Sequence, residues 1–271
     1  MTEVVIKPDW LAKHLDDPDL AIADCRFSLM QPELGQHQYN EGHIPGAFYF
    51  DLNQDLSSPI QTHGGRHPLP DIKKLSETLS TPGITPSTLV IAYDDSRFGF
   101  AARFWWLLRY VGHDRVKVLD GGFSNWQNAG YPVTTIEPVP KSKPFTPQIQ
   151  PDWIVNIDQV KAKKDLSQVA LIDSREAERY RGEREPIDPI AGHIPGAVNY
   201  PWQSVTDDRG FLKSPAELRD RYADLESKDE ILVYCGSGVT ACVNLLAMTA
   251  AGLDRAKLYP GSWSDWCSYQ V

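Results

Sequence analysis

The sequence predicts an α/β protein made of two tandem copies of one domain, each with a mainly parallel sheet flanked by helices. Three observations support this prediction. Short apolar segments alternate with amphipathic ones, four landmarks recur in the same order, and a proline-rich stretch separates the two series. Alternating strands and helices are typical of parallel sheets joined by helical crossovers. In such sheets, ligands bind beyond the carboxyl ends of the strands.

The four repeated landmarks are short segments of distinct character. They are an apolar strand ending in Asp-x-Arg, a Gly-His-Ile-Pro-Gly-Ala turn, a second apolar strand, and a Trp-containing segment that begins with Gly. They stand at 20–26, 42–47, 89–93 and 121–126 in the first series and at 169–175, 192–197, 231–234 and 261–266 in the second. The offset is far too long for a solenoid repeat, so it indicates two copies of a whole domain.

The boundary between the copies is marked by composition. Residues 137–151 hold five prolines, which disfavour a helix or a central strand and favour an extended linker. We therefore expect a first domain at 1–136 and a second at 152–271. Amphipathic helices are expected at 100–111 and 215–225, and both belong to the alternating pattern.

The overall composition excludes several classes of function. The 271 residues carry a net charge of −9, which disfavours nucleic-acid binding because phosphate affinity needs clustered cations. The first ten residues show no basic segment followed by an apolar core, so we expect no secretory signal, and no apolar run approaches membrane-spanning length. Four cysteines are too few for a disulfide scaffold and lack zinc-site spacing. We expect a protein of the reducing cytoplasm, without contact to membranes, and a monomer, since two domains can cover each other.

The apolar strand at 231–234 leads directly into Cys235, and residues 236–238 read Gly-Ser-Gly. A helical pattern begins at Val239 and ends at Gly252. Cys235 thus stands where a strand ends and a helix begins, where backbone N–H groups and the helix dipole favour an anion. Such a cysteine is expected to be available as a thiolate nucleophile. The alternative is a buried, inert cysteine at a strand end.

The other repeated residues are expected to be structural, because both copies carry them. His43 and His193 lie in turns that Pro and Gly shape. The Asp-x-Arg residues are expected to form ion pairs, and the Trp segments to belong to the core. Asp94 stands opposite Cys235 in the first copy, followed by bulkier residues than the Gly-Ser-Gly loop. We therefore expect the first domain to lack both nucleophile and anion cradle, and to wall one side of a cleft over Cys235.

These motifs resemble those of rhodanese domains, and the whole chain resembles a two-domain sulfurtransferase. The His-Ile-Pro-Gly-Ala turns, the loop Cys-Gly-Ser-Gly-Val-Thr at 235–240 and the closing segment Pro-Gly-Ser-Trp at 260–263 carry the resemblance. The loop is similar to that of 3-mercaptopyruvate sulfurtransferases. Thiosulfate-preferring rhodaneses typically have Arg and Lys where this chain has Gly236 and Ser237. A cation in the loop suits a dianionic donor, whereas a monoanionic keto acid needs less positive charge.

The resemblance implies sulfur transfer through a Cys235 persulfide, cradled by the N–H groups of residues 236–240, with Ser237 and Thr240 adding hydroxyl groups. The loop residues expected to bind the persulfide are Gly236, Ser237, Gly238, Val239 and Thr240. The donor is a small molecule, 3-mercaptopyruvate or alternatively thiosulfate. The acceptor is cyanide or a thiol, with thioredoxin among the candidates. The chemistry requires neither a metal nor an organic cofactor.

The donor's carboxylate needs cations. By the resemblance, Arg179 occupies the place of a substrate-binding arginine. The position where the family usually has a second arginine is Asp188 in this chain, and Arg184 is a candidate substitute. A solvated surface charge is the alternative interpretation of Arg184. Arg66, from the first domain, is another candidate for the second clamp.

His67 matches a family histidine that assists proton transfer near the active-loop serine, here Ser237. The aspartate usually paired with it is replaced by Asn53, although Asp51 is near. A complete serine–histidine–acid relay is therefore not expected, and His67 is either a cleft residue or an ordinary loop histidine.

Two other classes of function fit the sequence less well. Phosphatases of the same fold use Cys-x5-Arg, but Ala241 stands at the arginine position, so a phosphoryl group would lack its bidentate clamp. A non-catalytic binding module would not require the Cys235 loop. Cys242 could be a redox partner of Cys235, but its place on the following helix favours a core role, as is also expected for Cys25 and Cys267.

Overall fold

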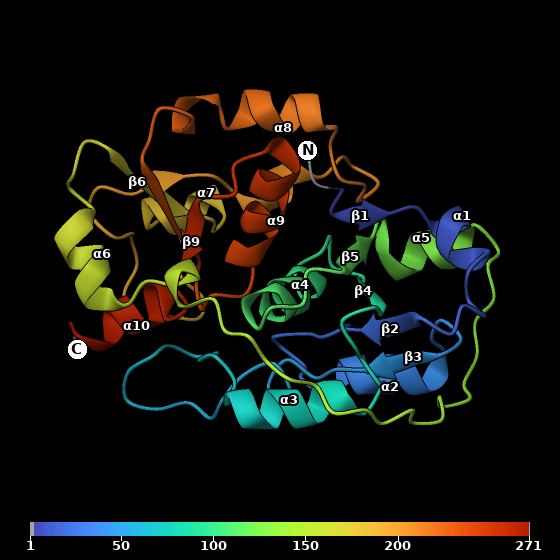
Figure 1. Cartoon of the computed structure of the whole chain (residues 1–271). Helices are drawn as coiled ribbons and strands as arrows, with labels where there is room; N and C mark the ends of the chain where they lie inside the picture. Colours follow the sequence, from blue (N-terminus) through green and yellow to red (C-terminus); the bar gives the residue numbers. More distant parts are fainter. Residues whose placement is uncertain (1–2, 271) are drawn as a thin grey trace.

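The computed structural model describes residues 3–270 and contains two parallel sheets, one from each half of the chain (Figure 1). The first sheet has the strand order β1-β5-β4-β2-β3 and the second β7-β6-β8-β9. All strand pairs in both sheets are parallel. The strands are β1 (Val5–Ile6), β2 (Leu20–Asp24), β3 (Ala47–Tyr49), β4 (Leu89–Tyr93), β5 (Val116–Leu119), β6 (Val169–Asp173), β7 (Val198–Asn199), β8 (Glu230–Tyr234) and β9 (Ala256–Leu258).

Helices flank both sheets, as the alternating pattern predicted. In the first half they are α1 (Pro8–Ala12), α2 (Leu34–Glu41), α3 (Ile72–Ser80), α4 (Ala101–Tyr110) and α5 (Gly122–Asn128). In the second half they are α6 (Ile157–Lys163), α7 (Ala177–Arg181), α8 (Pro215–Arg221), α9 (Ala241–Ala251) and α10 (Ser262–Ser268), with 3-10 turns at Pro151–Trp153, Trp202–Val205 and Ala223–Leu225. The predicted helix at 215–225 thus ends its α-helical part at Arg221. Residues 135–150 form no helix or strand.

The largest hydrophobic cluster is shared by the two halves. It joins residues such as Val90 and Trp105 of the first half to Val233 and Leu246 of the second. Helices α4 and α9 pack together at the centre of the molecule (Figure 1). All eleven residues of α9 are buried, because this helix is covered by its own sheet and by the first half. Two smaller clusters lie on the outer faces of the two sheets.

The repeated polar residues have structural roles, as predicted. Arg26 donates to both oxygens of Asp24 and to the Gly42 carbonyl. Arg175 makes the same bonds to Asp173 and the Gly192 carbonyl. The turn histidines each place Nδ1 against a tyrosine carbonyl and stack on that tyrosine ring. The Trp side chains of the closing segments are buried.

Candidate active site

Cys235 directly follows β8, which lies between β6 and β9 in the second sheet. The loop after it is tied to the start of α10 by its own backbone. The Cys235 carbonyl accepts from Trp263 N at 3.0 Å, and the Gly236 carbonyl accepts from Ser264 N at 2.9 Å. Cys235 N donates to Ser262 Oγ at 3.1 Å. Ser262 has φ of 57°, a left-handed conformation that its buried hydrogen bonds maintain.

The loop needs glycine at position 238. Gly238 has φ of +76°, and a Cβ atom there would lie 2.3 Å from the Pro260 carbonyl oxygen. Within residues 3–270, no hydrogen bond runs from the backbone N–H groups of residues 236–241 to another part of the chain. The donors of residues 236–240 precede α9, whose regular turns begin at Ala241 rather than at Val239. The loop is therefore an available anion cradle at a helix N-terminus.

The corresponding loop of the first half shows what such a cradle does. Asp94 takes the place of Cys235, and its carboxylate accepts from the N–H groups of Ser96, Phe98, Phe100 and Ala101 at 2.8–3.1 Å. The prediction that bulkier residues abolish this cradle is therefore wrong. The loop keeps its cradle by adopting positive φ at two non-glycine residues, and it wraps its own carboxylate. The first half thus retains the anion-binding backbone but fills it internally.

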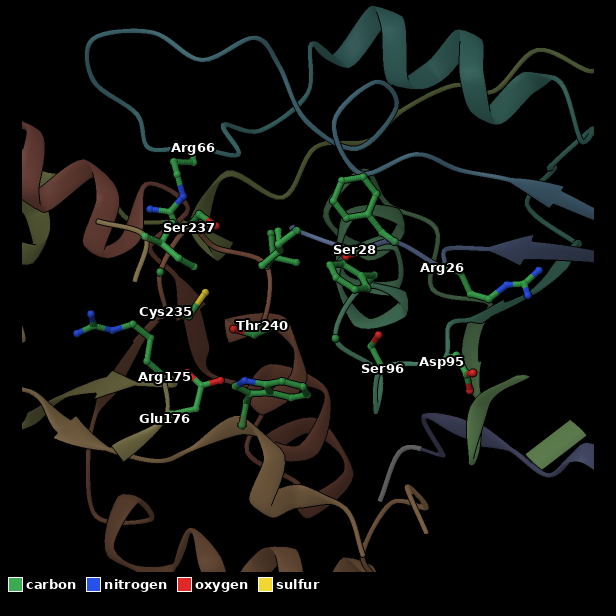
Figure 2. Close-up of a pocket in the computed structure, with 18 of the residues that line it drawn as sticks. Arg26, Ser28, Arg66, Asp95, Ser96, Arg175, Glu176, Cys235, Ser237 and Thr240 are labelled. Atoms are coloured by element: carbon green, nitrogen blue, oxygen red, sulfur yellow. The ribbon is translucent and has the colours of Figure 1, made fainter. Parts of the chain in front are cut away.

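A pocket of about 450 Å³ lies over Cys235 between the two halves. Figure 2 shows Arg66, Cys235, Ser237 and Thr240 on one side and residues of the first half, including Ser28, on the facing side. Its lining from the first half includes Phe27, Ser28, Leu29, Leu34, Arg66, Ser96 and Phe100, and from the second half Arg175, Glu176, Arg179, Ile187, Trp202, Cys235, Gly236, Ser237, Val239 and Thr240. The expected cleft, walled by the first domain, is thus present in the structure. Gly238 and His67 do not line it but contact residues that do.

Two arginines from different halves meet beside the cysteine. A Cβ atom added to Gly236 would lie 3.1 Å from Arg66 Nη2 and 3.5 Å from both terminal nitrogens of Arg179. Arg66 donates to one oxygen of Asp188 and Arg179 to the other, the latter at 3.2 Å. Burial raises the pKa of Asp188, and the guanidinium charges of Arg66 and Arg179 oppose the shift. The residue at the family's second-arginine position therefore holds the two arginines.

Arg184 does not reach this pocket. Its side chain is 65% exposed and lies 4.0 Å from Glu178 on the surface. The surface interpretation of Arg184 is the one that the geometry supports, because Arg66 already fills the space beside Arg179. Arg66 could be named from the sequence only as one of two candidates, since it lies more than a hundred positions from Arg179 along the chain.

His67 contacts the loop of residues 235–240, called the active loop below, through Ser237. The distance between His67 Nδ1 and Ser237 Oγ is 2.7 Å. Burial, with the nearby charges of Arg103 and Arg66, lowers the pKa of His67 to about 3, so the ring is neutral at physiological pH. Among the described residues, no carboxylate hydrogen-bonds to His67. Asn53 is exposed, and Asp51 accepts instead from nearby backbone N–H groups. The expectation of an incomplete relay agrees with this geometry.

Arg103 is a site residue that the sequence analysis missed. It is fully buried on α4, and it donates to the carbonyls of Gly238 at 3.1 Å, His67 at 3.3 Å and Leu56 at 3.4 Å. It thereby joins the first half to the active loop. Burial lowers the pKa of Arg103, and the thiols of Cys242 and Cys235 oppose the shift. The signal in the sequence was an arginine in the first turn of a mostly apolar helix, whose other arginine, Arg109, lies in the last turn.

The remaining cysteines are buried free thiols. Burial raises the pKa of Cys242 to about 12, and its Sγ donates to the Gly238 carbonyl at 3.5 Å. This is the packing role predicted for it. The described residues include no group of three or more His, Cys, Asp or Glu side chains that could hold a metal ion. Among residues 3–270, no helix has the length and apolarity that crossing a membrane requires.

Comparisons with known proteins agree with this architecture. The pattern of the rhodanese-like domain matches residues 7–129 and again residues 156–269. The chain therefore belongs to the rhodanese-like family, as a member with two such domains.

Among its relatives, a Pseudomonas aeruginosa protein named "Probable 3-mercaptopyruvate sulfurtransferase" is 44% identical, over 94% of this chain and 92% of that protein. The thiosulfate sulfurtransferase of Rattus norvegicus is 32% identical, over 97% of this chain and 91% of that protein. The crystal structure of SseA from Escherichia coli, described among 3-mercaptopyruvate sulfotransferases, superimposes with a TM-score of 0.83 at 33% identity, covering 97% of this chain and 100% of SseA.

Proposed function

We propose that this chain is a sulfurtransferase that moves sulfur from 3-mercaptopyruvate to a thiol or cyanide, with Cys235 as the nucleophile. The observation that carries the proposal is Cys235 at the end of β8, within a loop whose N–H groups bond to no other described residue and beside two arginines. An anion cradle around a sulfur nucleophile suits a persulfide, and the arginines suit a carboxylate. The second domain is therefore the catalytic one, and the first is catalytically silent.

In the first half-reaction, the Cys235 thiolate attacks the thiol sulfur of 3-mercaptopyruvate. The new S–S bond forms as the C–S bond breaks, and its electron pair leaves on the enolate of pyruvate. The proton lost from the donor's sulfur is taken up at that carbon, which leaves pyruvate and a Cys235 persulfide anion. We assign the Ser237 hydroxyl, held by His67, to the enolate oxygen. Arg66 and Arg179 bind the carboxylate.

In the second half-reaction, the acceptor attacks the outer sulfur. Cyanide forms thiocyanate and the S–S bond returns its electron pair to Cys235, whereas a thiol takes the sulfur as its own persulfide. The N–H groups of residues 236–240 and the Thr240 hydroxyl stabilise the persulfide until then. A thiol protein such as thioredoxin is our proposed acceptor in the cytoplasm, where free cysteines persist, and we propose a monomeric enzyme.

The proposal is tested by mass spectrometry of the protein after incubation with 3-mercaptopyruvate and removal of the donor. The wild-type protein is expected to gain the mass of one sulfur atom at Cys235, and cyanide is expected to remove it. The Cys235→Ser variant should gain nothing, whereas Cys242→Ala, which removes the neighbouring thiol, should keep the adduct. An unmodified wild-type protein after treatment with both 3-mercaptopyruvate and thiosulfate would contradict the proposal.

Thiosulfate is the second candidate donor, because a relative with that activity in its name matches nearly the whole chain. The same persulfide would form, with sulfite as the leaving group. Relative kcat/KM values for the two donors distinguish the candidates. A preference for 3-mercaptopyruvate is expected, since the loop itself carries no cation at Gly236 or Ser237. A rhodanese-like module that only binds a partner would form no persulfide at all.

A further inference from the structure

Beside the active loop, six charged side chains form one continuous hydrogen-bonded chain of alternating sign. Its order, from the second sheet to the pocket rim, is Asp173, Arg175, Glu185, Arg179, Asp188 and Arg66. Three guanidinium groups therefore face three carboxylates, and their formal charges balance. An equal number of carboxylates therefore balances the cations beside Cys235, and the six side chains together carry no net positive charge.

Asp188 is the member of this charged network that links the two halves of the protein. One of its oxygens bonds to Arg66 of the first half and the other to Arg179 of the second. Its side chain is only 2% exposed, so water screens its charge poorly. Among the described residues, Arg66 Nη2 and Arg179 Nη1 have no acceptor, and both lie beside Gly236.

We propose that Asp188 sets the charge of the donor that this site accepts, orienting Arg66 and Arg179 toward a single carboxylate while opposing a second negative charge. This inference rests on the proposed function and identifies the donor class as monoanionic. Asp188 is a positioning and selectivity residue, because it acts through the two arginines and does not need to touch the donor.

The physical reason is that Coulomb energy scales with the charge of the ligand. A buried carboxylate behind the two guanidinium groups repels a dianion such as thiosulfate about twice as strongly as it repels a monoanionic keto acid at the same distance. Both donors use the orientation of the arginines, so a loss of orientation lowers both rates. Only the charge of Asp188 changes the ratio between them.

The test compares kcat/KM for persulfide formation from thiosulfate and from 3-mercaptopyruvate in the Asp188→Asn variant. The ratio of thiosulfate to 3-mercaptopyruvate is expected to rise by about tenfold or more over wild type, because one buried negative charge is removed at nearly constant shape. Asp188→Glu, which keeps the charge, should retain the wild-type ratio even if both rates fall. An unchanged ratio in Asp188→Asn would overturn the inference and leave Asp188 as a purely structural anchor.

Asp165→Asn is the matched control for net charge. Asp165 is 73% exposed and pairs with Lys164 on the surface, so the same loss of one charge should leave the ratio unchanged. If this control raised the ratio as Asp188→Asn does, the effect would belong to the overall field of the protein, and the inference would be wrong.

A binding experiment separates this inference from the catalytic proposal. In the Cys235→Ser background, pyruvate and sulfate can be titrated by intrinsic tryptophan fluorescence, since Trp202 lines the pocket. Pyruvate is expected to bind at least about tenfold more tightly than sulfate, and Asp188→Asn should reduce that difference. Equal affinities of pyruvate and sulfate for the Cys235→Ser protein that retains Asp188 would overturn the inference, even if the wild-type protein forms a persulfide. Failure of the catalytic proposal would instead appear as an absent persulfide in the wild-type protein.

Discussion

His67 is a histidine whose environment keeps it uncharged. It is 7% exposed, its Nδ1 meets Ser237 Oγ, and two arginine charges lie near it. A protonated imidazole would add a third cation to a buried region. The neutral ring can hold the serine hydroxyl in one orientation through either a donor or an acceptor nitrogen, and this is the role the proposed mechanism requires.

The depressed pKa of His67 predicts how stability depends on pH. The pKa is lowered from 6.5 to about 3, so between these values the unfolded chain binds a proton at this site that the folded protein does not. Stability therefore rises with pH through that window, by up to about 1.4 kcal/mol per pH unit for this one group. Chemical denaturation of wild type and His67→Gln from pH 5 to 7 should show a shallower slope in the variant. If the free energy of unfolding changed with pH by the same amount in both proteins, His67 would not be neutral in the folded protein.

At the scale of elements, the loop after β8 is shaped by close backbone contacts. Its carbonyls are tied to α10, the Gly238 carbonyl accepts from Arg103, and the Gly238 Cα faces Pro260. These contacts direct the N–H groups away from the rest of the chain. In the first half, the Asp94 carboxylate organises an equivalent loop, which shows that the strand–loop–helix unit binds anions without any glycine-rich sequence.

Gly238→Ala is expected to destabilise the protein and distort the active loop. The change combines a left-handed conformation with a Cβ atom 2.3 Å from the Pro260 oxygen, and should cost about 2 kcal/mol or more. Gly252→Ala is the control: its φ is +93°, but nothing lies within 4 Å of the added atom. That variant should lose only about 1 kcal/mol. Urea unfolding of both variants measures the difference, and equal losses would show that the Pro260 contact is unimportant.

At the scale of the whole molecule, the two halves share their main core and complete one site together. Helix α9 is buried on every side, and Arg103 crosses from the first half to the active loop. The loop around Gly64 also docks on α10 of the second half, where Gly64 N donates to Asp265 at 2.7 Å and Arg66 N donates to Ser264 at 3.1 Å. The first half therefore supplies part of the shared core, places Arg66 beside the loop after β8, and provides His67 as the hydrogen-bond partner of Ser237.

The isolated second domain, residues 152–271, is expected to be poorly packed. Without the first half, the apolar side chains of α9 that meet α4 would be exposed to water, and the site would lack Arg66 and His67. The fragment should bind the dye ANS and unfold over a broad denaturant range, and it should form persulfide far more slowly than the full chain. A fragment with a sharp transition and full activity would contradict a shared core.

The amino-acid pattern alone was sufficient to predict the fold class, the internal repeat, the position of Cys235 and the location of its glycine loop. These follow from local patterns: apolar strands, turn residues, and a landmark order that occurs twice. The structural roles of the Asp-x-Arg pairs and the turn histidines were also predictable. Both copies carry these residues, whereas only the second copy carries Cys235, so the shared fold explains the shared residues better than a function of one copy. The identity of the family rests on those same local motifs.

The charges that surround the cysteine could be identified only in the folded molecule. Arg66 and Arg179 are far apart in the chain, and sequence spacing could not show that Asp188 joins them or that Arg184 stays on the surface. Arg103 was hidden because an arginine in an apolar helix has no local partner to reveal its role. The Asp94 cradle was missed because backbone conformation, rather than residue size, decides whether N–H groups converge. Contacts between distant segments depend on how two folded halves pack, and that packing is set by the shared core.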